Sequence, residues 1–156
     1  MPGTPALARW TRVRRRAAPV LIPAYRAAWW MLRGWSLATR PRLRGVKCVL
    51  RDDAGRVVWV RHTYGDRAAW ELPGGAARRS ESAPEAARRE AREELGVDVT
   101  GWRDVGTVSG RWTGAQLALT CCVADWPADA RLDPDPVEIA AATWPRQRRR
   151  PAGSGG

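Results

Sequence analysis

The sequence predicts an α+β domain, because several β-branched runs surround one strongly signalled helix. Residues 45–51 and 56–62 are rich in Val and flank the turn sequence Asp-Asp-Ala-Gly at residues 52–55, which is typical of a β-hairpin. The helix is expected over residues 83–95. Three further strand-like runs follow it, at residues 105–109, 116–124 and 138–144.

The expected helix has start and stop signals at both ends. Ser82 is a candidate N-cap, and Glu85 stands three residues later, which is the spacing of a capping box. Pro84 is tolerated in the first turn of a helix, and Gly96 is typical of the residue just past a helix C-terminus. These signals predict the bounds of the helix closely.

The chain of 156 residues is long enough for one domain with a sizeable core. Its composition predicts four segments: a disordered basic leader at residues 1–24, a Trp-rich helix at 25–40, the folded domain at 41–145 and a disordered tail at 146–156. The apolar part of the leader is short and contains Pro19 and Pro23, so it is no membrane span. The Trp-rich helix is expected either to pack on the domain or to lie in a membrane surface, which would give peripheral membrane contact.

Positive charge is concentrated in the N-terminal third. The chain has 27 basic and 16 acidic residues, for a net charge of +11. Residues 1–51 contain twelve of the basic residues and no acidic one, so residues 52–156 hold 15 basic and 16 acidic residues. Nearly all of the basic residues are Arg and Phe is absent, which indicates a coding bias toward GC-rich codons. The high pI therefore predicts no specific nucleic-acid partner.

The cysteines and histidine exclude two other classes. Cys48, Cys121 and Cys122 are an odd number without the spacing of a disulfide framework, and His62 is the only histidine. A zinc site is therefore not expected, and a reducing, cytoplasmic location fits best.

Three carboxylates share one side of the expected helix. At about 100° per residue, Glu90, Glu93 and Glu94 fall within a sector of roughly 100°. Like charges so placed repel one another, and Mg²⁺ or Mn²⁺ is a natural counter-charge for clustered carboxylates. Magnesium shares its coordination with phosphate oxygens, so such a site points to phosphoryl or pyrophosphoryl chemistry. The alternative is a solvated Glu/Arg helix face.

A spaced set of charged and glycine residues decides between these alternatives. The pattern is Gly, five residues, Glu, seven residues, Arg-Glu, an apolar residue, any residue, Glu-Glu, any residue, Gly and an apolar residue. It is carried by Gly75, Glu81, Arg89, Glu90, Ala91, Glu93, Glu94, Gly96 and Val97. The chain thereby resembles the Nudix hydrolases over about residues 44–144. Ala91 is smaller than the usual Leu or Val, and Ser80 replaces a glycine often found there.

The resemblance implies an α/β/α sandwich with a central mixed β-sheet, in which the signature forms a loop–helix–loop. It also implies Mg²⁺- or Mn²⁺-dependent hydrolysis of a nucleoside diphosphate linked to another group. Residues that match the family's metal ligands are Glu90, Glu93, Glu94, the carbonyl of Gly74 and, as an outer or additional ligand, Glu81.

Two further residues match family positions with other roles. Arg89 resembles the residue that orients the glutamates by a salt bridge. Glu138 resembles a late glutamate that completes the metal site or acts as the base, its alternative being a surface acid at the start of a strand. Either Glu90 or Glu138 would accept the proton of the attacking water.

Residues outside the signature are candidates to bind substrate. Arg61, Arg78 and Arg111 could hold phosphates, and Tyr64 and Trp112 could stack on a base. For each, a solvated surface position or simple packing on the domain is the alternative.

The expected partner is a small nucleoside diphosphate derivative, bound by a monomer or homodimer. Three other functions stay open: a catalytically weak Nudix-like module that binds or senses a nucleotide, a nucleic-acid-binding protein that uses its basic arm, and an isoprenoid diphosphate isomerase. The complete set of signature acids argues against the first, and the intact hydrolase signature against the last.

Overall fold

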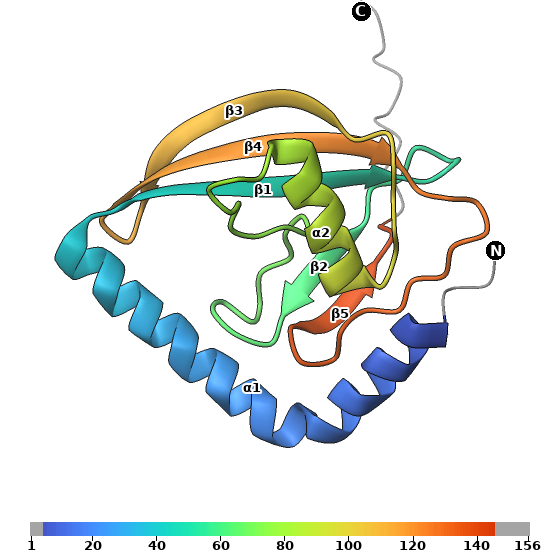
Figure 1. Cartoon of the computed structure of the whole chain (residues 1–156), viewed down its shortest axis with the longest axis horizontal. Helices are drawn as coiled ribbons and strands as arrows, with labels where there is room; N and C mark the ends of the chain where they lie inside the picture. Colours follow the sequence, from blue (N-terminus) through green and yellow to red (C-terminus); the bar gives the residue numbers. More distant parts are fainter. Residues whose placement is uncertain (1–4, 146–156) are drawn as a thin grey trace, which may run out of the picture.

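A computed structural model describes residues 5–145 of the chain, with side chains described from Val13 onward. Two helices and five strands follow one another in the order α1 (Pro5–Thr39), β1 (Arg42–Arg51), β2 (Trp59–His62), α2 (Ala83–Leu95), β3 (Arg103–Trp112), β4 (Ala115–Asp125) and β5 (Ile139–Thr143). Figure 1 shows β1, β4 and β3 stacked side by side, with α2 crossing in front and the long α1 running along the β2–β5 side of the molecule.

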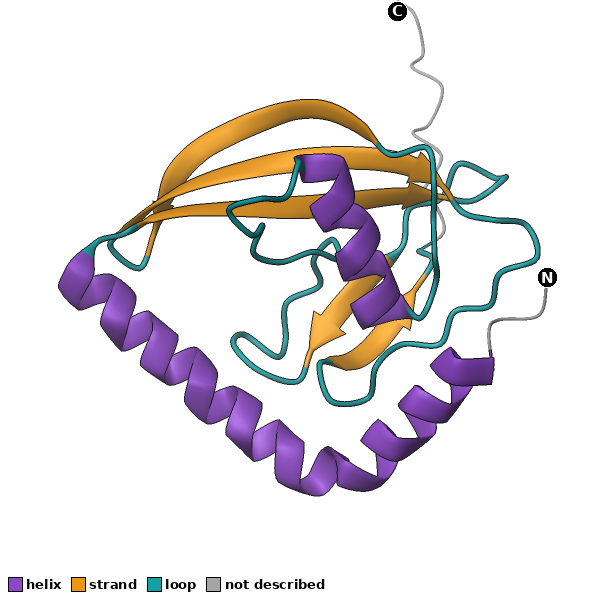
Figure 2. Cartoon of the chain, in the orientation of Figure 1, coloured by secondary structure: helices purple, strands orange, loops and turns teal. Residues whose placement is uncertain are grey.

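The strands form two sheets. In the larger sheet β4 lies in the centre, parallel to β1 and antiparallel to β3. Cys48 of β1 lies opposite Cys122 of β4 in this register. In the smaller sheet β2 pairs antiparallel with β5 (Figure 2). The expectation of an α+β fold with a mixed central sheet is confirmed.

The two strands around residues 52–55 do not form the predicted hairpin ladder. The turn itself is present, because Asp52 Oδ1 accepts a hydrogen bond from the N–H of Arg56 at 2.8 Å. Beyond it only the bridge between Arg51 and Val57 joins the two runs. They separate because residues 73–76 occupy the edge of β1 that faces away from β4, while β2 takes β5 as its partner.

Helix α2 begins at Ala83 and ends at Leu95, as predicted. The side chain of Ser82 accepts a hydrogen bond from the N–H of Glu85, and the Glu85 carboxylate accepts one from the N–H of Ser82 at 2.8 Å, which completes the capping box. Gly96 ends the helix in the left-handed conformation, with φ of 70°.

The core lies between α2 and the two sheets. Ala91 and Leu95 on one side of α2 are fully buried and pack with side chains from β1, β2, β4 and β5. The members of this cluster are Leu50, Val58, Val60, Ala91, Leu95, Val97, Val99, Ala124 and Ile139. Because the signature helix supplies part of the core, packing fixes the direction in which its acidic side faces.

Residues 5–39 form a single helix, which differs from the disordered leader predicted for residues 1–24. Pro19 and Pro23 lie inside α1. Each lacks a backbone N–H and crowds the preceding turn, which accounts for the bend of α1 in Figure 1. The predicted tail at residues 146–156 lies outside the described residues. Among residues 5–145, no helix has both the length and the apolar character needed to cross a membrane.

One side of α1 faces the rest of the molecule. The half-buried or buried side chains recur every three or four residues, as in Arg14, Leu21, Tyr25, Trp29 and Ser36. The Trp29 ring lies edge-on to Trp112 at the end of β3, with ring centroids 6.4 Å apart. The same inward side of α1 also contacts the loop that precedes β5, through the bond from Tyr25 to Glu138.

Candidate functional site

The free edge of β1 holds the glycine loop that precedes α2. The N–H of Val46 donates to the carbonyl of Gly75 at 2.9 Å, and the N–H of Cys48 donates to the carbonyl of Pro73 at 2.8 Å. Between these bonds Gly74 has φ of 138°, and a Cβ at this position would lie 2.1 Å from the carbonyl oxygen of Val46. The loop can therefore approach β1 this closely only with glycine at residue 74.

The glycine loop encloses two carboxylates of α2. The N–H of Gly74 donates to Oε2 of Glu94 at 2.9 Å, and Glu94 is only 1% exposed. Glu90 is 8% exposed, and a Cβ on Gly75 would lie 2.7 Å from its Oε1. Glu93, one turn along, is half-exposed. The three acids thus occupy one side of α2, with Glu94 the deepest and Glu93 nearest the surface.

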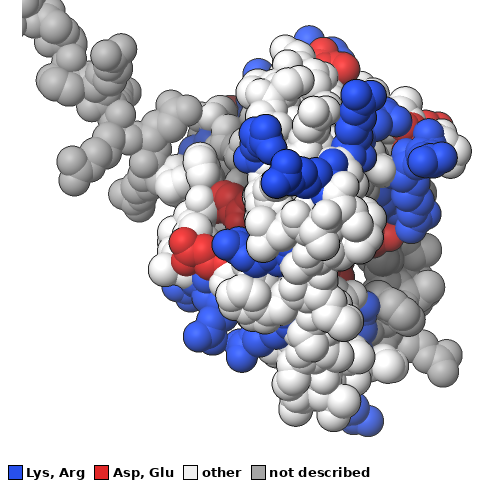
Figure 3. Space-filling model, turned by 90° about the vertical axis from the view of Figure 1, so that its left-hand side faces the viewer, with Lys and Arg blue, Asp and Glu red and all other residues white. Residues whose placement is uncertain are grey.

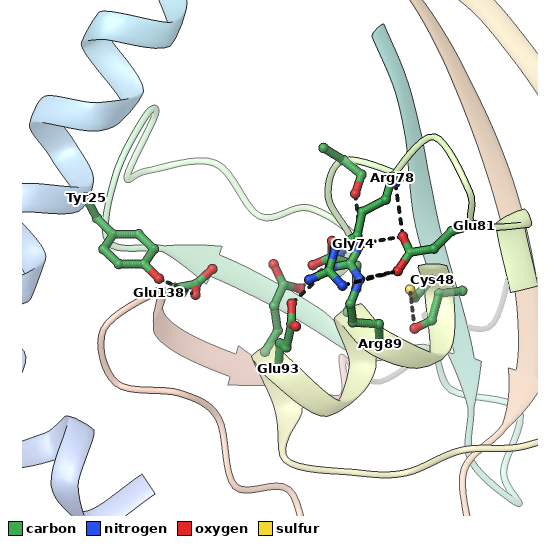
Figure 4. Close-up of polar contacts among 12 residues, drawn as sticks. Tyr25, Cys48, Gly74, Arg78, Glu81, Arg89, Glu93 and Glu138 are labelled. Atoms are coloured by element: carbon green, nitrogen blue, oxygen red, sulfur yellow. Dashed lines mark hydrogen bonds and ion pairs between the residues drawn. The ribbon is translucent and has the colours of Figure 1, made fainter. Parts of the chain in front are cut away.

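Arg89 links four acceptors around this group (Figure 4). Its Nη1 donates to Glu90 and to Glu93 at 2.8 and 2.9 Å. Its Nε and Nη2 donate to the two carboxylate oxygens of Glu81 at 2.8 and 3.0 Å, and Nη2 also reaches the carbonyl of Ala76 at 2.9 Å. The paired bonds to Glu81 fix the plane of the guanidinium, so Arg89 holds Glu90 and Glu93 in place.

Burial and charge act in opposite directions on these carboxylates. Burial raises the pKa of Glu94 well above its ordinary value, and burial also raises the pKa of Glu90 despite the opposing charge of Arg89. The hydrogen bonds from Arg89 instead lower the pKa of Glu81 to about 2. The negative charge of Glu90 and Glu94, here called the inner pair, is therefore not fully compensated by neighbouring positive groups. Glu81, in contrast, is fully ionised at neutral pH.

His62 lies beside the inner pair. Its Nδ1 is 4.0 Å from Oε1 of Glu94, and this buried nitrogen has no hydrogen-bond partner among the described residues. Burial lowers the pKa of His62, so the ring is neutral near pH 7. No sequence signal predicts this neighbour, since His62 stands in β2, which is distant along the chain from α2.

These residues fit a hard divalent cation, which prefers oxygen ligands. The carboxylate oxygens of Glu90 and Glu94 are buried beside the loop of Gly74, and their negative charge is not fully compensated. As they lie, no three His, Cys, Asp or Glu side chains within residues 5–145 are arranged to hold a metal ion. The reason is local: Arg89 engages Glu90 and Glu93, and the N–H of Gly74 engages Glu94. Cation binding therefore requires a carboxylate to turn away from Arg89.

Glu138 reaches the site from the loop before β5, and α1 holds it there. The hydroxyl of Tyr25 donates to Oε1 of Glu138 at 3.0 Å, and Nη2 of Arg14 donates to the same oxygen at 3.3 Å. Arg14 also forms an ion pair with Asp135 at 2.6 Å. Burial raises the pKa of Glu138, although the bond from Tyr25 opposes the shift. Sequence reasoning missed Arg14 and Tyr25, because no local pattern marks a contact across more than a hundred residues.

The candidate substrate residues have three different surroundings. Tyr64 packs on the His62 ring at 5.0 Å between centroids, and Arg78 lies 3.8 Å from Glu81, so both border the carboxylates. Trp112 instead packs on Trp29 of α1, near the turn between β3 and β4, and the neighbouring Arg111 is exposed there. Arg61 stacks its guanidinium 5.4 Å from the Trp70 ring.

Comparison with known proteins identifies the family of the chain. The NUDIX domain family model matches residues 41–148, so the chain belongs to the NUDIX domain family. The RNA pyrophosphohydrolase of Teredinibacter turnerae is 44% identical over 52 residues, which is 33% of this chain and 30% of that protein. The chain thus matches less than a third of the length of this relative.

Two solved structures share the fold. The MutT protein from Methanosarcina mazei Go1 has a TM-score of 0.56 and 24% identity, covering 68% of this chain and 78% of that one. The NUDIX domain of Shewanella oneidensis NrtR, solved with ADP ribose, has a TM-score of 0.57 and 21% identity, covering 69% and 74%. At these identities the likeness concerns the fold alone.

Proposed function

We propose that this protein hydrolyses the pyrophosphate bond of a nucleoside diphosphate derivative, with Mg²⁺ or Mn²⁺ as cofactor. The observation that carries the proposal is the burial of Glu90 and Glu94 beside the loop of Gly74. Burying two carboxylates with incomplete compensation costs stability, so a cation is the expected partner. Bound divalent cations would neutralise a diphosphate and lower the pKa of the attacking water.

The chain's own residues have separate tasks in this scheme. Glu90, Glu93 and Glu94 hold the cation, together with the carbonyl of Gly74. Arg89 orients Glu90 and Glu93 and neutralises part of their charge in the free protein. Glu81 stays ionised at neutral pH and fixes the guanidinium of Arg89.

Glu138 is the proposed proton acceptor, with Glu90 as the alternative. A carboxylate whose pKa is raised is a stronger base, and burial raises the pKa of Glu138. Tyr25 and Arg14 both hold its Oε1. They act as positioning residues, since they contact Glu138 and not the expected place of the diphosphate.

Two substrate classes deserve testing first. RNA pyrophosphohydrolase is the name of the relative that shares 44% identity over 52 residues, which suggests pyrophosphate groups on RNA. ADP-ribose is the ligand in the NrtR structure. Arg78 and Tyr64 border the carboxylates and are the first candidates to contact phosphate and base, followed by Arg61, Arg111 and Trp112.

We also propose that the protein acts in the cytoplasm as a monomer or homodimer. All three cysteines are free, which supports a reducing compartment.

A module that binds a nucleotide without cleaving it is the second candidate. The observation that favours it is the engagement of Glu90 and Glu93 by Arg89, because a site locked in this way would not assemble a metal centre. The two candidates differ in turnover and not in binding.

The experiment is a panel of substrates incubated with the full chain in Mg²⁺ or Mn²⁺, with products identified by mass. It includes 5′-triphosphorylated RNA, ADP-ribose, nucleoside triphosphates and dinucleoside polyphosphates. Reaction in ¹⁸O-labelled water identifies the phosphorus that is attacked. We expect cation-dependent cleavage of at least one compound. Saturable binding of a panel member with no product under either cation would instead establish the binding module.

A further inference from the structure

The outward side of α1 is apolar over most of its length. Val20, Trp30, Met31, Trp35 and Leu37, here called the outer face of α1, are all exposed, with Val20 at 76% and Met31 at 69%. Met31 and Trp35 are four residues apart, so they share one side of the part of α1 that follows Pro23. Figure 3 shows a largely uncharged strip on the face turned toward the viewer, with Lys and Arg along it and Asp and Glu beside part of it. Such contiguous apolar surface marks an interaction site.

Contacts on the inward side fix the direction of the outer face. Tyr25 is bonded to Glu138, and Nε of Arg26 donates to the carbonyl of Thr63 at 3.0 Å. Further along, Trp29 packs against Trp112. These contacts are spread along the helix, so α1 cannot rotate to bury Met31 or Val20 against its own domain.

The charges on α1 itself have one sign. Residues 1–51 include twelve basic residues and no acidic one. Arg16, Arg40, Arg42 and Arg44 are exposed on or just after α1. A partner that covers this surface must therefore offer negative charge next to an apolar interior.

An anionic bilayer has this chemistry. Trp rings favour the membrane interface, and Arg side chains reach from an apolar contact to lipid phosphates. A second copy of the chain is a poorer partner, because a symmetric dimer would bring the same acid-free segment against itself.

We propose that the outer face of α1 docks on an anionic membrane surface, with the part of the helix that follows Pro23 parallel to the bilayer plane. Tyr25 and Glu138 meet on the opposite side of the same helix. Docking would therefore hold the carboxylate site about one helix diameter, or about 10 Å, from the headgroups. Substrates presented at the membrane surface would then be favoured.

The test is flotation of the full chain with vesicles of phosphatidylserine and phosphatidylcholine, compared with vesicles of phosphatidylcholine alone. No nucleotide is needed, so the result is independent of the proposed hydrolysis. We expect at least about tenfold stronger binding to the anionic vesicles, because each basic residue near the surface adds attraction. Equal binding to both vesicles, or none to either, would overturn the proposal.

A matched pair of double variants locates the contact. Val20→Glu with Met31→Glu places two charges on the outer face of α1, and binding is expected to fall about tenfold or more. Val105→Glu with Val108→Glu makes the same change on β3, where both valines are also exposed, and should leave binding unchanged. Melting curves for both confirm folding. Equal loss in the two variants, or light scattering that shows a dimer which only the α1 variant breaks, would contradict a membrane partner.

Discussion

The two helices, α2 and α1, are specified in different ways. Local sequence signals specify α2: a capping box at Ser82 and Glu85, a terminal glycine and a side of small apolar residues. α1 has two internal prolines and no acidic residue in its first turn. Its inward side is held by partners far along the chain, such as Glu138 and Thr63. A helix with weak local signals can thus form through tertiary contacts.

The two helices also differ in their proposed roles in catalysis. The acids that α2 carries form the proposed metal centre, whereas α1 contacts its surroundings through Glu138 and through the ring of Tyr64. Changes on α2 should therefore remove turnover, and changes on α1 should adjust it.

The largest effect is expected from Glu93→Gln. The change removes one charge from the proposed cation site but keeps the side-chain shape, so turnover should fall by about 10²–10⁴, or roughly 3–5 kcal/mol in the barrier. Steady-state kinetics at saturating Mg²⁺ measure it. The control is Asp98→Asn, which removes an exposed acid paired with Arg88 just beyond α2 and should leave turnover unchanged. Near-normal turnover of Glu93→Gln would remove Glu93 from the site.

Gly74→Ala tests whether the close approach of the glycine loop to β1 is needed for stability and turnover. A Cβ there meets the carbonyl of Val46 at 2.1 Å, so the loop must move. We expect a loss of about 2–4 kcal/mol in stability together with a large loss of turnover. Gly55→Ala is the control: its φ is also positive, at 73°, but nothing lies within 4 Å of the new Cβ. It should cost only about 1 kcal/mol and leave turnover intact. Similar behaviour of the two variants would show that close approach to β1 is unimportant.

Glu94→Gln tests whether the buried charge of Glu94 destabilises the folded protein. Because burial raises the pKa of Glu94 above its ordinary value of 4.5, ionisation destabilises the folded state, and stability falls as pH rises through the folded pKa. Gln stays neutral and can still accept the N–H of Gly74. Without divalent cations the variant should melt about 2–8 °C above wild type at neutral pH.

This advantage should shrink as the pH falls toward the ordinary carboxyl value of 4.5 and vanish below it, where wild-type Glu94 is protonated in the folded and the unfolded state. Thermal melts over a pH series provide the measurement. Wild type and variant with parallel pH profiles would mean that Glu94 carries no destabilising charge.

The smallest effect is expected on α1, from Tyr25→Phe. It removes one hydrogen bond to Glu138 and keeps the ring, so kcat should fall about two- to tenfold with KM unchanged. Thr39→Val removes a hydrogen bond of α1 to the carbonyl of Trp35, away from the site, and should change neither constant. A loss in Tyr25→Phe as large as that in Glu93→Gln would erase the distinction between the two helices.

The sequence was sufficient where the determinants are close along the chain. Helical spacing alone places Glu90, Glu93 and Glu94 on one side of α2, and the capping box sets where α2 begins. The predicted hairpin is limited to its turn and one bridge, because a turn at residues 52–55 does not reveal that residues 73–76 take the rest of that edge of β1.

The sequence was insufficient where the partner comes from a distant element. The bond from Tyr25 to Glu138 spans 113 residues, and His62 meets Glu94 only because β2 and α2 share a core. No periodicity encodes either contact. Both depend on how separate elements pack.

The most direct test of the central claim is a calorimetric titration of Mn²⁺ into the wild-type chain and Glu93→Gln, each with a non-hydrolysable nucleoside diphosphate analogue. The account predicts saturable binding to wild type and at least about tenfold weaker binding to the variant, since a charged ligand is lost. No Mn²⁺ binding to wild type, or equal affinity in the two proteins, would contradict the assignment of the α2 carboxylates as a metal site.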